Sequence, residues 1–172
     1  MTFKSLLVAC MLGLSMSAWA QRDVDLMDWK EIEVPPPPAF DVGKLLTFEV
    51  SSGSSLVYGV DPATLNIGKD GIVRYVMVAS NATGARNVWY EGIRCATGEF
   101  KTYARHTTTD GWRKIDNADW RSVFGNLPSK HAVEFARAGA CDNTAPASSV
   151  YDIVRQLKAG RFNQQTWGNR PV

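Results

Sequence analysis

The sequence predicts an α+β domain in which an antiparallel β meander is packed by two C-terminal helices and stapled by one disulfide. Short β-branched and aromatic runs, separated by turn residues, fill the chain from residue 45 to residue 105. Their close spacing leaves no length for crossover helices, which favours antiparallel pairing. An apolar stripe with helical spacing follows near residue 150. Of the three cysteines, Cys95 lies at the end of a predicted strand and Cys141 lies between the two predicted helices.

The first twenty residues have the pattern of a secretory signal peptide. Lys4 precedes an almost wholly apolar run over residues 5–18, and Ala18-Trp19-Ala20 is a small-x-small cleavage site before Gln21. The apolar run is shorter than the ~20 residues of a membrane-spanning helix. We therefore expect residues 1–20 to be removed and the mature chain, without a transmembrane segment, to be exported.

A lipobox is the alternative to this leader. The tetrapeptide Leu7-Val8-Ala9-Cys10 has its pattern and would make Cys10 a lipidated N-terminus. Only Ser5 and Leu6 separate Lys4 from this motif, whereas the apolar part of a signal peptide needs about 7–15 residues. The motif comes too early in the chain, so cleavage before Gln21 is favoured.

Residues 21–40 form an acidic and proline-rich arm. Four consecutive prolines occupy residues 35–38, a run that adopts extended polyproline II and acts as a stiff spacer. Two arrangements remain open for this arm: it is mobile, or it lies across the domain through Trp29 and Phe40. The domain itself is expected to span residues 41–160, and residues 161–172, which lack periodicity, are expected to be a loose tail.

Charge is distributed unevenly along the chain, although the net charge is only +2. Residues 21–70 hold nine acids and four bases, whereas residues 71–172 hold eight acids and fourteen bases. The near balance excludes a strongly basic nucleic-acid binder, and we expect no nucleic-acid partner. The simplest interpretation is that the acidic N-terminal part packs against the basic remainder of the chain. The more specific alternative is that the basic residues form a surface that binds an anionic partner.

The strand region breaks into short runs punctuated by turns. Gly68-Lys69-Asp70-Gly71 is the strongest tight-turn signal, and weaker turn signals lie near Ser51, Asn81 and Gly98. The predicted strands cover residues 45–50, 56–60, 64–67, 72–79, 86–95 and 100–105. After Thr107 the pattern becomes irregular and polar.

Two helices are predicted after the strands. Residues 130–138 form the weaker one, with Ala132, Phe135 and Ala136 on one face and Gly139 at its end. The final helix follows an apolar stripe that recurs at helical spacing from Val150. The stripe consists of Val150, Ile153, Val154 and Leu157. Ser149 and Asp152 form a capping box at its start, and Gly160 fits its C-cap.

The mature chain keeps two cysteines, Cys95 and Cys141, because Cys10 leaves with the signal peptide. In an oxidising compartment such a pair predicts a disulfide. A redox-active pair is the alternative, but the chain has no Cys-x-x-Cys motif. We therefore expect a structural bridge that pins the helical tail to the sheet.

One segment resembles a known family. Residues 85–95 read Ala-Arg-Asn-Val-Trp-Tyr-Glu-Gly-Ile-Arg-Cys, and Trp29-Lys30-Glu31, residues 68–75, Trp112 and Trp120-Arg121 add to the likeness. Together they resemble the cryptic neisserial protein 1-like family, small exported proteins of Gram-negative bacteria, from about Trp29 to Leu157. The resemblance implies a periplasmic location, and it implies no catalytic residue, cofactor or metal ligand.

Glu91 is the strongest candidate for chemistry. Strand alternation places Trp89, Glu91, Ile93 and Cys95 on one face, so Glu91 would be a partly buried carboxylate. The functional hypothesis is a general acid or base. The structural alternative, which we favour, is an ion pair between sheet and helices with Arg137 or Arg121 as its partner.

The other charged residues favour structural roles. Arg94 and Arg74 lie on predicted strands beside apolar neighbours, where an arginine stacks or extends its charged end towards solvent. An anion-binding role is their alternative. Neither His106 nor His131 has the spacing of a metal site, and surface or capping roles are favoured for both.

Aromatic residues give the best hint of binding. Trp112 and Trp120 lie in the irregular segment beside Arg113 and Arg121, and surfaces of this composition are common in binding sites. The alternative is that the rings close the edge of a small core. We hold Trp112, Arg113, Trp120 and Arg121 as candidate binding residues.

Two functions remain open on these grounds. The favoured hypothesis is a non-catalytic binding or structural module of the cell envelope, with an envelope protein or polysaccharide as partner. The alternative is a small envelope hydrolase that uses Glu91 with His106 or Asp110. The sequence leaves the oligomeric state open.

Overall fold

The computed structural model describes residues 28–50 and 54–160. The predicted signal peptide, the tail after Gly160 and most of the predicted turn at residues 51–54 lie outside the described residues. The chain divides into two units, residues 1–31 and residues 32–172. The fold, the site and the contacts below all belong to the second unit.

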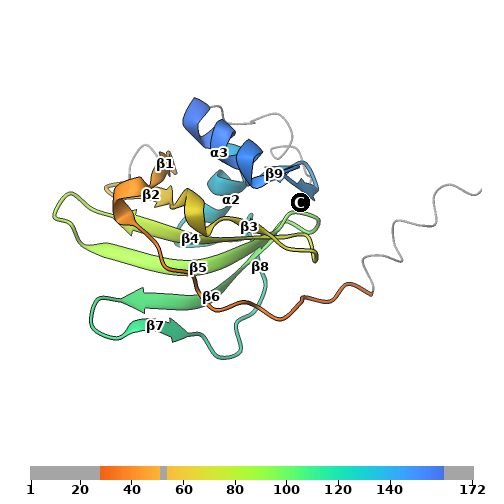
Figure 1. The fold of residues 1–172 in the computed structure, drawn as a ribbon, viewed down its shortest axis with the longest axis horizontal. Helices are drawn as coiled ribbons and strands as arrows, with labels where there is room; N and C mark the ends of the chain where they lie inside the picture. Colours follow the sequence, from red (N-terminus) through yellow and green to blue (C-terminus); the bar gives the residue numbers. More distant parts are fainter. Residues whose placement is uncertain (1–27, 51–53, 161–172) are drawn as a thin grey trace, which may run out of the picture. The chain divides into compact units, whose positions relative to one another are not determined.

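An antiparallel sheet forms the centre of this unit, as the short turns require. Its strands follow the order β1-β2-β4-β5-β6-β7, with β3 paired to β4 and β8 paired to β6. Figure 1 shows β4, β5 and β6 as its long central strands. The bounds are β1 (Leu46–Phe48), β2 (Val57–Val60), β3 (Asn66–Ile67), β4 (Ile72–Ser80), β5 (Arg86–Arg94), β6 (Glu99–Thr107), β7 (Gly111–Lys114) and β8 (Arg121–Ser122).

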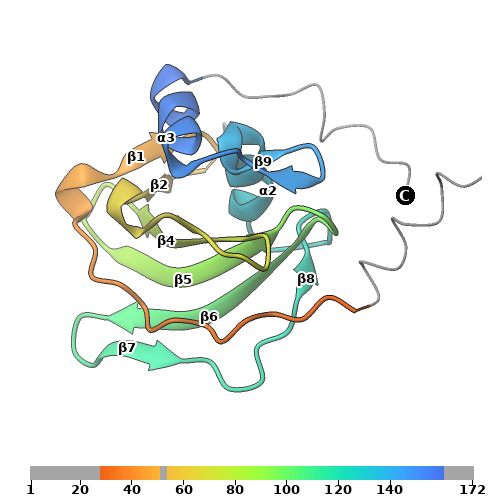
Figure 2. The same cartoon turned by 45° about the vertical axis from the view of Figure 1, so that its right-hand side comes forward.

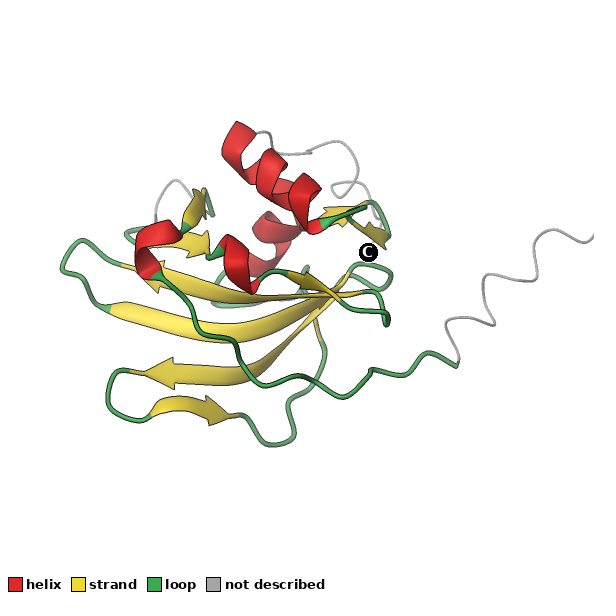
Figure 3. Cartoon of the chain, in the orientation of Figure 1, coloured by secondary structure: helices red, strands yellow, loops and turns green. Residues whose placement is uncertain are grey.

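Short helical elements frame the sheet, and the longer ones follow it in the chain (Figure 3). They are η1 (Val42–Lys44), η2 (Pro62–Thr64), α2 (His131–Phe135), the π-helical turn η3 (Ala136–Ala140) and α3 (Val150–Ala159). A two-stranded ribbon of β9 (Cys141–Asp142) and β10 (Ala145–Pro146) joins η3 to α3. The α+β fold with a meander sheet and two C-terminal helical segments is therefore confirmed.

One face of the sheet, here called the helix face, is covered by α2, η3 and α3. In both views of the ribbon these helices lie on the same side of β4 and β5 (Figures 1 and 2). The apolar stripe of α3 supplies Ile153 and Leu157, because residues spaced by three and four share one side of a helix. The buried sheet residues of this cluster include Val73, Tyr75, Met77, Ile93 and Phe100.

The opposite face, here called the arm face, is covered by the chain's own N-terminal segment. Val34 and Phe40 pack against a smaller buried cluster, and the backbone N–H of Ile32 donates to Asp70 over 3.3 Å. Residues 32–40 therefore lie across the sheet, on the side away from α2 and α3 (Figure 2). The buried cluster consists of Val76, Val78, Val88, Tyr90, Tyr103 and Ala104.

A β-bulge in β6 decides which of its side chains reach each face. Tyr90 pairs with Ala104 whereas Glu91 pairs with Thr102, which leaves Tyr103 as the extra residue. Thr102 consequently shares the helix face with Glu91, while Tyr103 and Ala104 both turn to the arm face. Gly92 makes room for this, since a Cβ there would lie 2.6 Å from the hydroxyl of Tyr103.

The predicted caps and turns are confirmed where side chains and glycines dictate the backbone. The Ser149 hydroxyl accepts from the N–H of Asp152 at 3.1 Å, and Gly160 closes α3 with φ of 59°. In the β3–β4 turn, Gly71 has φ of 75°. The disulfide between Cys95 and Cys141 is also confirmed, with 5.7 Å between the Cα atoms. It ties the end of β5 to the helical cover.

Two local predictions were wrong. Thr64 lies in η2 rather than in a strand, because Asp61 caps that turn and Pro62 starts it. The segment after Thr107, predicted to be irregular, contains β7 and β8. Both strands are held by hydrogen bonds to β6, so they form without a strong strand pattern in their own sequence. The helix predicted over residues 130–138 is confirmed as α2 continued by η3, and Gly139, with φ of 128°, interrupts the helical backbone next to its predicted end.

Candidate functional site

Glu91 lies at the centre of a polar cluster inside the helix face. The residue is 1 % exposed, among the least exposed charged residues of the described ranges. Strand alternation alone places it there, since Trp89 and Ile93 on the same side of β5 pack against the same core. The prediction that Glu91 faces the core is therefore confirmed.

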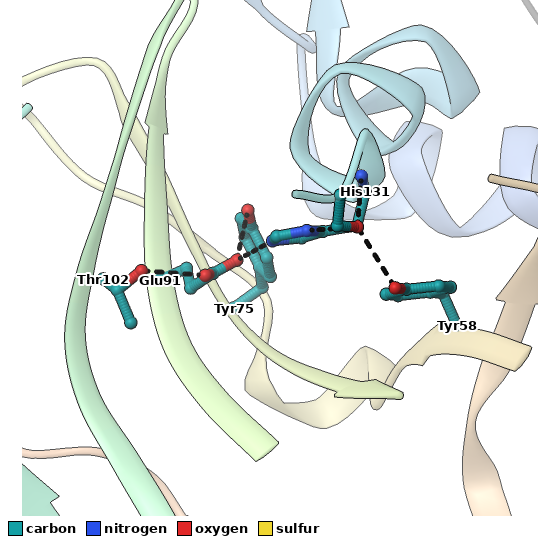
Figure 4. Close-up of polar contacts among 6 residues, drawn as sticks. Tyr58, Tyr75, Glu91, Thr102 and His131 are labelled. Carbon is teal, nitrogen blue, oxygen red and sulfur yellow. Dashed lines mark hydrogen bonds and ion pairs between the residues drawn. The ribbon is translucent and has the colours of Figure 1, made fainter. Parts of the chain in front are cut away.

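Three side chains surround the Glu91 carboxylate (Figure 4). The Thr102 hydroxyl donates to Oε1 at 2.9 Å, and the Tyr75 hydroxyl donates to Oε2 at 3.2 Å. His131 Nε2 lies 2.9 Å from the same Oε2. Tyr75 and Thr102 are the direct cross-strand neighbours of Glu91 on β4 and β6, and His131 reaches down from the start of α2. The cluster thus joins three strands to the helical cover.

Aromatic rings enclose the imidazole of His131. Tyr58 stacks on it with ring centroids 5.9 Å apart and 3° between the planes, and Trp89 stacks with 5.6 Å and 14°. Phe100 presents its ring edge at 5.7 Å. The expectation of a surface role for His131 is wrong, because the residue is only 8 % exposed. Its ring orientation is fixed by packing and by hydrogen bonds at both nitrogens.

The network continues from His131 to two hydroxyl groups. Ser129 Oγ lies 3.0 Å from His131 Nδ1, accepts from the backbone N–H of His131 at 3.2 Å and donates to the Tyr58 hydroxyl at 3.1 Å. Both ring nitrogens of His131 are therefore engaged, Nδ1 with the hydroxyl of Ser129 and Nε2 with the carboxylate of Glu91.

The environment of Glu91 pulls its pKa in two directions. Burial raises the pKa, since it removes water from the charged form. The charge of His131 and the hydrogen bonds from His131, Thr102 and Tyr75 outweigh burial, and the net pKa is lowered. Burial and the neighbouring Glu91 charge raise the pKa of Tyr75 well above its usual value. Glu91 is therefore ionised at neutral pH and Tyr75 holds its proton.

The cluster has the residue types of a serine relay in an unusual order. Ser129, His131 and Glu91 are connected through one imidazole, as in a catalytic triad. Here Nδ1 faces the serine and Nε2 faces the carboxylate. Ser129 is half-buried, while Glu91 and His131 are buried, so Ser129 is the end of the relay nearer to solvent.

The predicted partners of Glu91 were wrong. Arg137 pairs with Glu134, one turn along the same helical segment, at 2.8 Å. Arg121 places its guanidinium 4.7 Å above the ring of Phe100. The structural role predicted for Glu91 is retained, but its partner is His131 at the start of α2 rather than an arginine.

The structure also separates Glu91 from the other proposed catalytic residues. His106 pairs with Val88 and packs edge-on against Phe40 at 5.1 Å, which puts it on the arm face. Asp110 lies in the β6–β7 turn and accepts from the hydroxyl of Thr109 at 3.2 Å. Neither residue joins the Glu91 cluster.

The four candidate binding residues divide between two ends of β6. β7, with Trp112 and Arg113, pairs with its C-terminal half, and Arg121 pairs with Phe100 near its start. The two places are five residue steps apart along β6, about 16 Å. Trp112 packs on the arm face beside Phe40 and Tyr90, and Trp120 lies 5.5 Å below the ammonium group of Lys101. The four residues do not form one site.

A second buried charged pair lies on the arm face. Arg74 Nη1 and Nη2 donate to the two oxygens of Asp70 at 3.1 and 2.6 Å, and Arg74 also lies 5.8 Å from the ring of Tyr103. Burial raises the pKa of Asp70, but hydrogen bonds from Arg74 and Ile72 and the charge of Arg74 outweigh it and lower the pKa. Arg94, the other predicted structural arginine, ends β5 opposite Glu99. Arg74 thus has the structural role that the sequence favours.

Sequence reasoning missed most of the Glu91 cluster, although one signal was available. His131 precedes Phe135 by four residues, so the apolar stripe of the predicted helix extends to His131. Tyr75 and Thr102 depend on the pairing register and on the bulge, neither of which a single strand reveals.

Within residues 28–50 and 54–160, no group of three or more histidine, cysteine or acidic side chains has the arrangement of a metal site. The same residues contain no helix with the length and hydropathy of a membrane span.

Comparison with known proteins identifies the family. Neither the curated proteins nor the solved structures gave a match to this chain. A sequence model of the CNP1-like family matches residues 25–158, a range that includes the whole Glu91 cluster and the two cysteines of the disulfide. This match agrees with the resemblance carried by residues 85–95, and the chain therefore belongs to the CNP1-like family.

Proposed function

We propose that this chain is a non-catalytic binding or structural module of the cell envelope, exported to the periplasm. One observation carries the non-catalytic part: both oxygens of the Glu91 carboxylate already hold donors inside the core. A carboxylate engaged in this way connects sheet to helix, and at 1 % exposure it is not accessible to a substrate from solvent. The leader pattern of residues 1–20 and the disulfide support export to an oxidising compartment.

Native mass spectrometry of the protein released gently from the periplasm tests the proposal. We expect a chain that begins at Gln21, is two hydrogens lighter than the reduced form and retains an envelope component. The matched control lacks residues 2–20 and should stay in the cytoplasm. A full-length chain recovered from the cytoplasm would overturn export, and a lipidated chain that begins at Cys10 would replace the cleaved leader.

The relay through His131 supports a second candidate, a serine hydrolase. In that reaction Ser129 Oγ attacks an ester carbonyl and passes its proton to His131 Nδ1. The alkoxide leaving group takes this proton, and water then hydrolyses the acyl-serine with His131 again as base. The distance of 3.0 Å between Ser129 Oγ and Nδ1 favours it. The bonds from Ser129 to Tyr58 and to the His131 backbone oppose it.

A fluorophosphonate probe separates the two functions, because it labels an activated serine covalently. We expect no labelling of the folded, oxidised protein. A label that maps to Ser129, disappears in Ser129→Ala and persists in the control Ser122→Ala would establish the hydrolase.

A further inference from the structure

Two arginines face each other across the β6–β7 pair. Arg105 is the direct register partner of Arg113, so both side chains project from the helix face of the sheet. The same register places Trp89 of β5 directly beside Arg105. Trp89, Arg105 and Arg113 therefore form a row across three neighbouring strands, here called the arginine row.

The two guanidinium groups of the arginine row are available for binding. Both residues are exposed, and neither makes a side-chain hydrogen bond or ion pair within the described ranges 28–50 and 54–160. The nearest acid along the chain is Asp110 in the intervening turn, and its carboxylate accepts from the hydroxyls of Thr107 and Thr109. Like charges directly opposite each other destabilise a sheet, and a bound anion removes that repulsion.

Trp89 adds a ring surface to this pair of charges. One side of its indole stacks on the imidazole of His131, which holds the ring in place, and the residue remains half-buried. A fixed aromatic ring beside two guanidinium forks suits a ligand with a ring next to an oxyanion. The strand pair that carries the arginines lies at the end of the sheet away from α3 (Figures 1 and 2).

We propose that the arginine row binds an acidic saccharide, with the oxyanion on Arg105 and Arg113 and the sugar ring against Trp89. This inference rests on the proposed binding function and gives its ligand a chemical class. Of the four candidate binding residues from the sequence, only Arg113 belongs to the proposed site, together with Arg105 and Trp89.

Oligogalacturonate is the probe, because each of its sugar rings carries a carboxylate. Affinity is measured by calorimetry on the oxidised mature chain, and a phosphorylated oligosaccharide in a second series distinguishes phosphate from carboxylate as the oxyanion. Arg105→Gln/Arg113→Gln should weaken binding about tenfold or more, because the loss of one charged hydrogen bond weakens affinity by a factor on the order of ten. Both arginines are exposed, so the variant keeps its fold, which circular dichroism checks.

The matched control is Arg86→Gln/Lys114→Gln, which removes the same charge from two exposed positions outside the row. It should bind as the unmodified protein does. Equal loss in both double variants, or equal affinity for ringless polyphosphate, would assign the binding to net charge and overturn the proposal. So would the absence of binding to either saccharide.

These outcomes are separable from those of the proposed function. An envelope component that stays bound to the Arg105→Gln/Arg113→Gln protein would reject the arginine row and leave the binding module standing. A chain that remains in the cytoplasm would reject the envelope function, while calorimetry would still decide the saccharide site.

Discussion

Each face of the sheet buries a charged side chain, but the partner of that side chain comes from a distant helix on one face and from a neighbouring turn on the other. On the helix face Glu91 is held by a histidine that comes from a helix forty residues along the chain. On the arm face Arg74 is held by Asp70, four residues away in the adjoining turn. The helix face therefore depends on tertiary docking of α2, whereas the arm face carries a pair that the β3–β4 hairpin forms locally.

The segments that cover the two faces also differ in how firmly they are attached to the sheet. α2 and α3 follow the sheet in the chain and are tied to it by the disulfide from Cys95 to Cys141. The arm face is covered by an extended segment that holds on through Val34, Phe40 and the N–H of Ile32. We expect the helix face to dominate the stability of the domain, because it buries the larger apolar cluster and the larger polar network.

Removal of the Glu91 carboxylate should produce the largest effect. Glu91→Ala leaves Tyr75, Thr102 and His131 with buried donors and no acceptor, and breaking a buried charged pair costs about 3–5 kcal/mol. Urea unfolding at pH 7 measures the loss. The control Glu134→Ala breaks the more exposed pair with Arg137 and should cost about 1 kcal/mol or less. Equal losses in both proteins would contradict a central role for the Glu91 cluster.

The charged pair of the arm face should cost somewhat less to break. Arg74→Met leaves Asp70 buried beside two backbone N–H donors, from Ile32 and Ile72, and we expect a loss of about 3 kcal/mol. Adding Asp70→Asn removes the uncompensated charge and should restore part of the stability. A double variant less stable than the sum of its single changes would show that Asp70 is held by something other than Arg74.

The arm should contribute the smallest loss at neutral pH. Phe40 is half-buried between His106 and Trp112, with ring centroids 5.1 and 5.7 Å away, so Phe40→Ala should cost about 1 kcal/mol. Tyr151→Ala, which truncates an exposed ring on α3, should leave the unfolding midpoint unchanged. Should Phe40→Ala match that control, the arm would cover the sheet without stabilising it.

The dependence of stability on acid pH tests the buried carboxylates of both faces in the unmodified protein. Glu91 and Asp70 both have a pKa lowered in the folded protein, so each stabilises the fold above its unfolded pKa and loses this contribution as the pH falls. Unfolding free energy should stay level from pH 7 to about 5 and then decrease. In Glu91→Gln the decrease should be shallower than in the unmodified protein. A steeper decrease would mean that Glu91 is protonated in the fold.

The sequence alone determined the features that depend on neighbouring residues. Alternation along residues 87–95 placed Glu91 in the core, Ser149 and Gly160 bounded α3, and Gly68-Lys69-Asp70-Gly71 specified the turn before β4. Backbone conformation and side-chain periodicity decide each of these within a few residues. The pairing of Cys95 with Cys141 followed from the number of cysteines expected to remain after cleavage.

Only the tertiary structure decided what Glu91 contacts. The β4–β5 register brought Tyr75, the bulge in β6 turned Thr102 towards the carboxylate, and the docking of α2 placed His131 above it. It also opposed Arg105 to Arg113, through strand pairing that gives β7 its place despite a weak local signal. Contacts of this kind join residues far apart in the chain, and their geometry is set by the packing of whole elements. Local propensity carries no record of that packing.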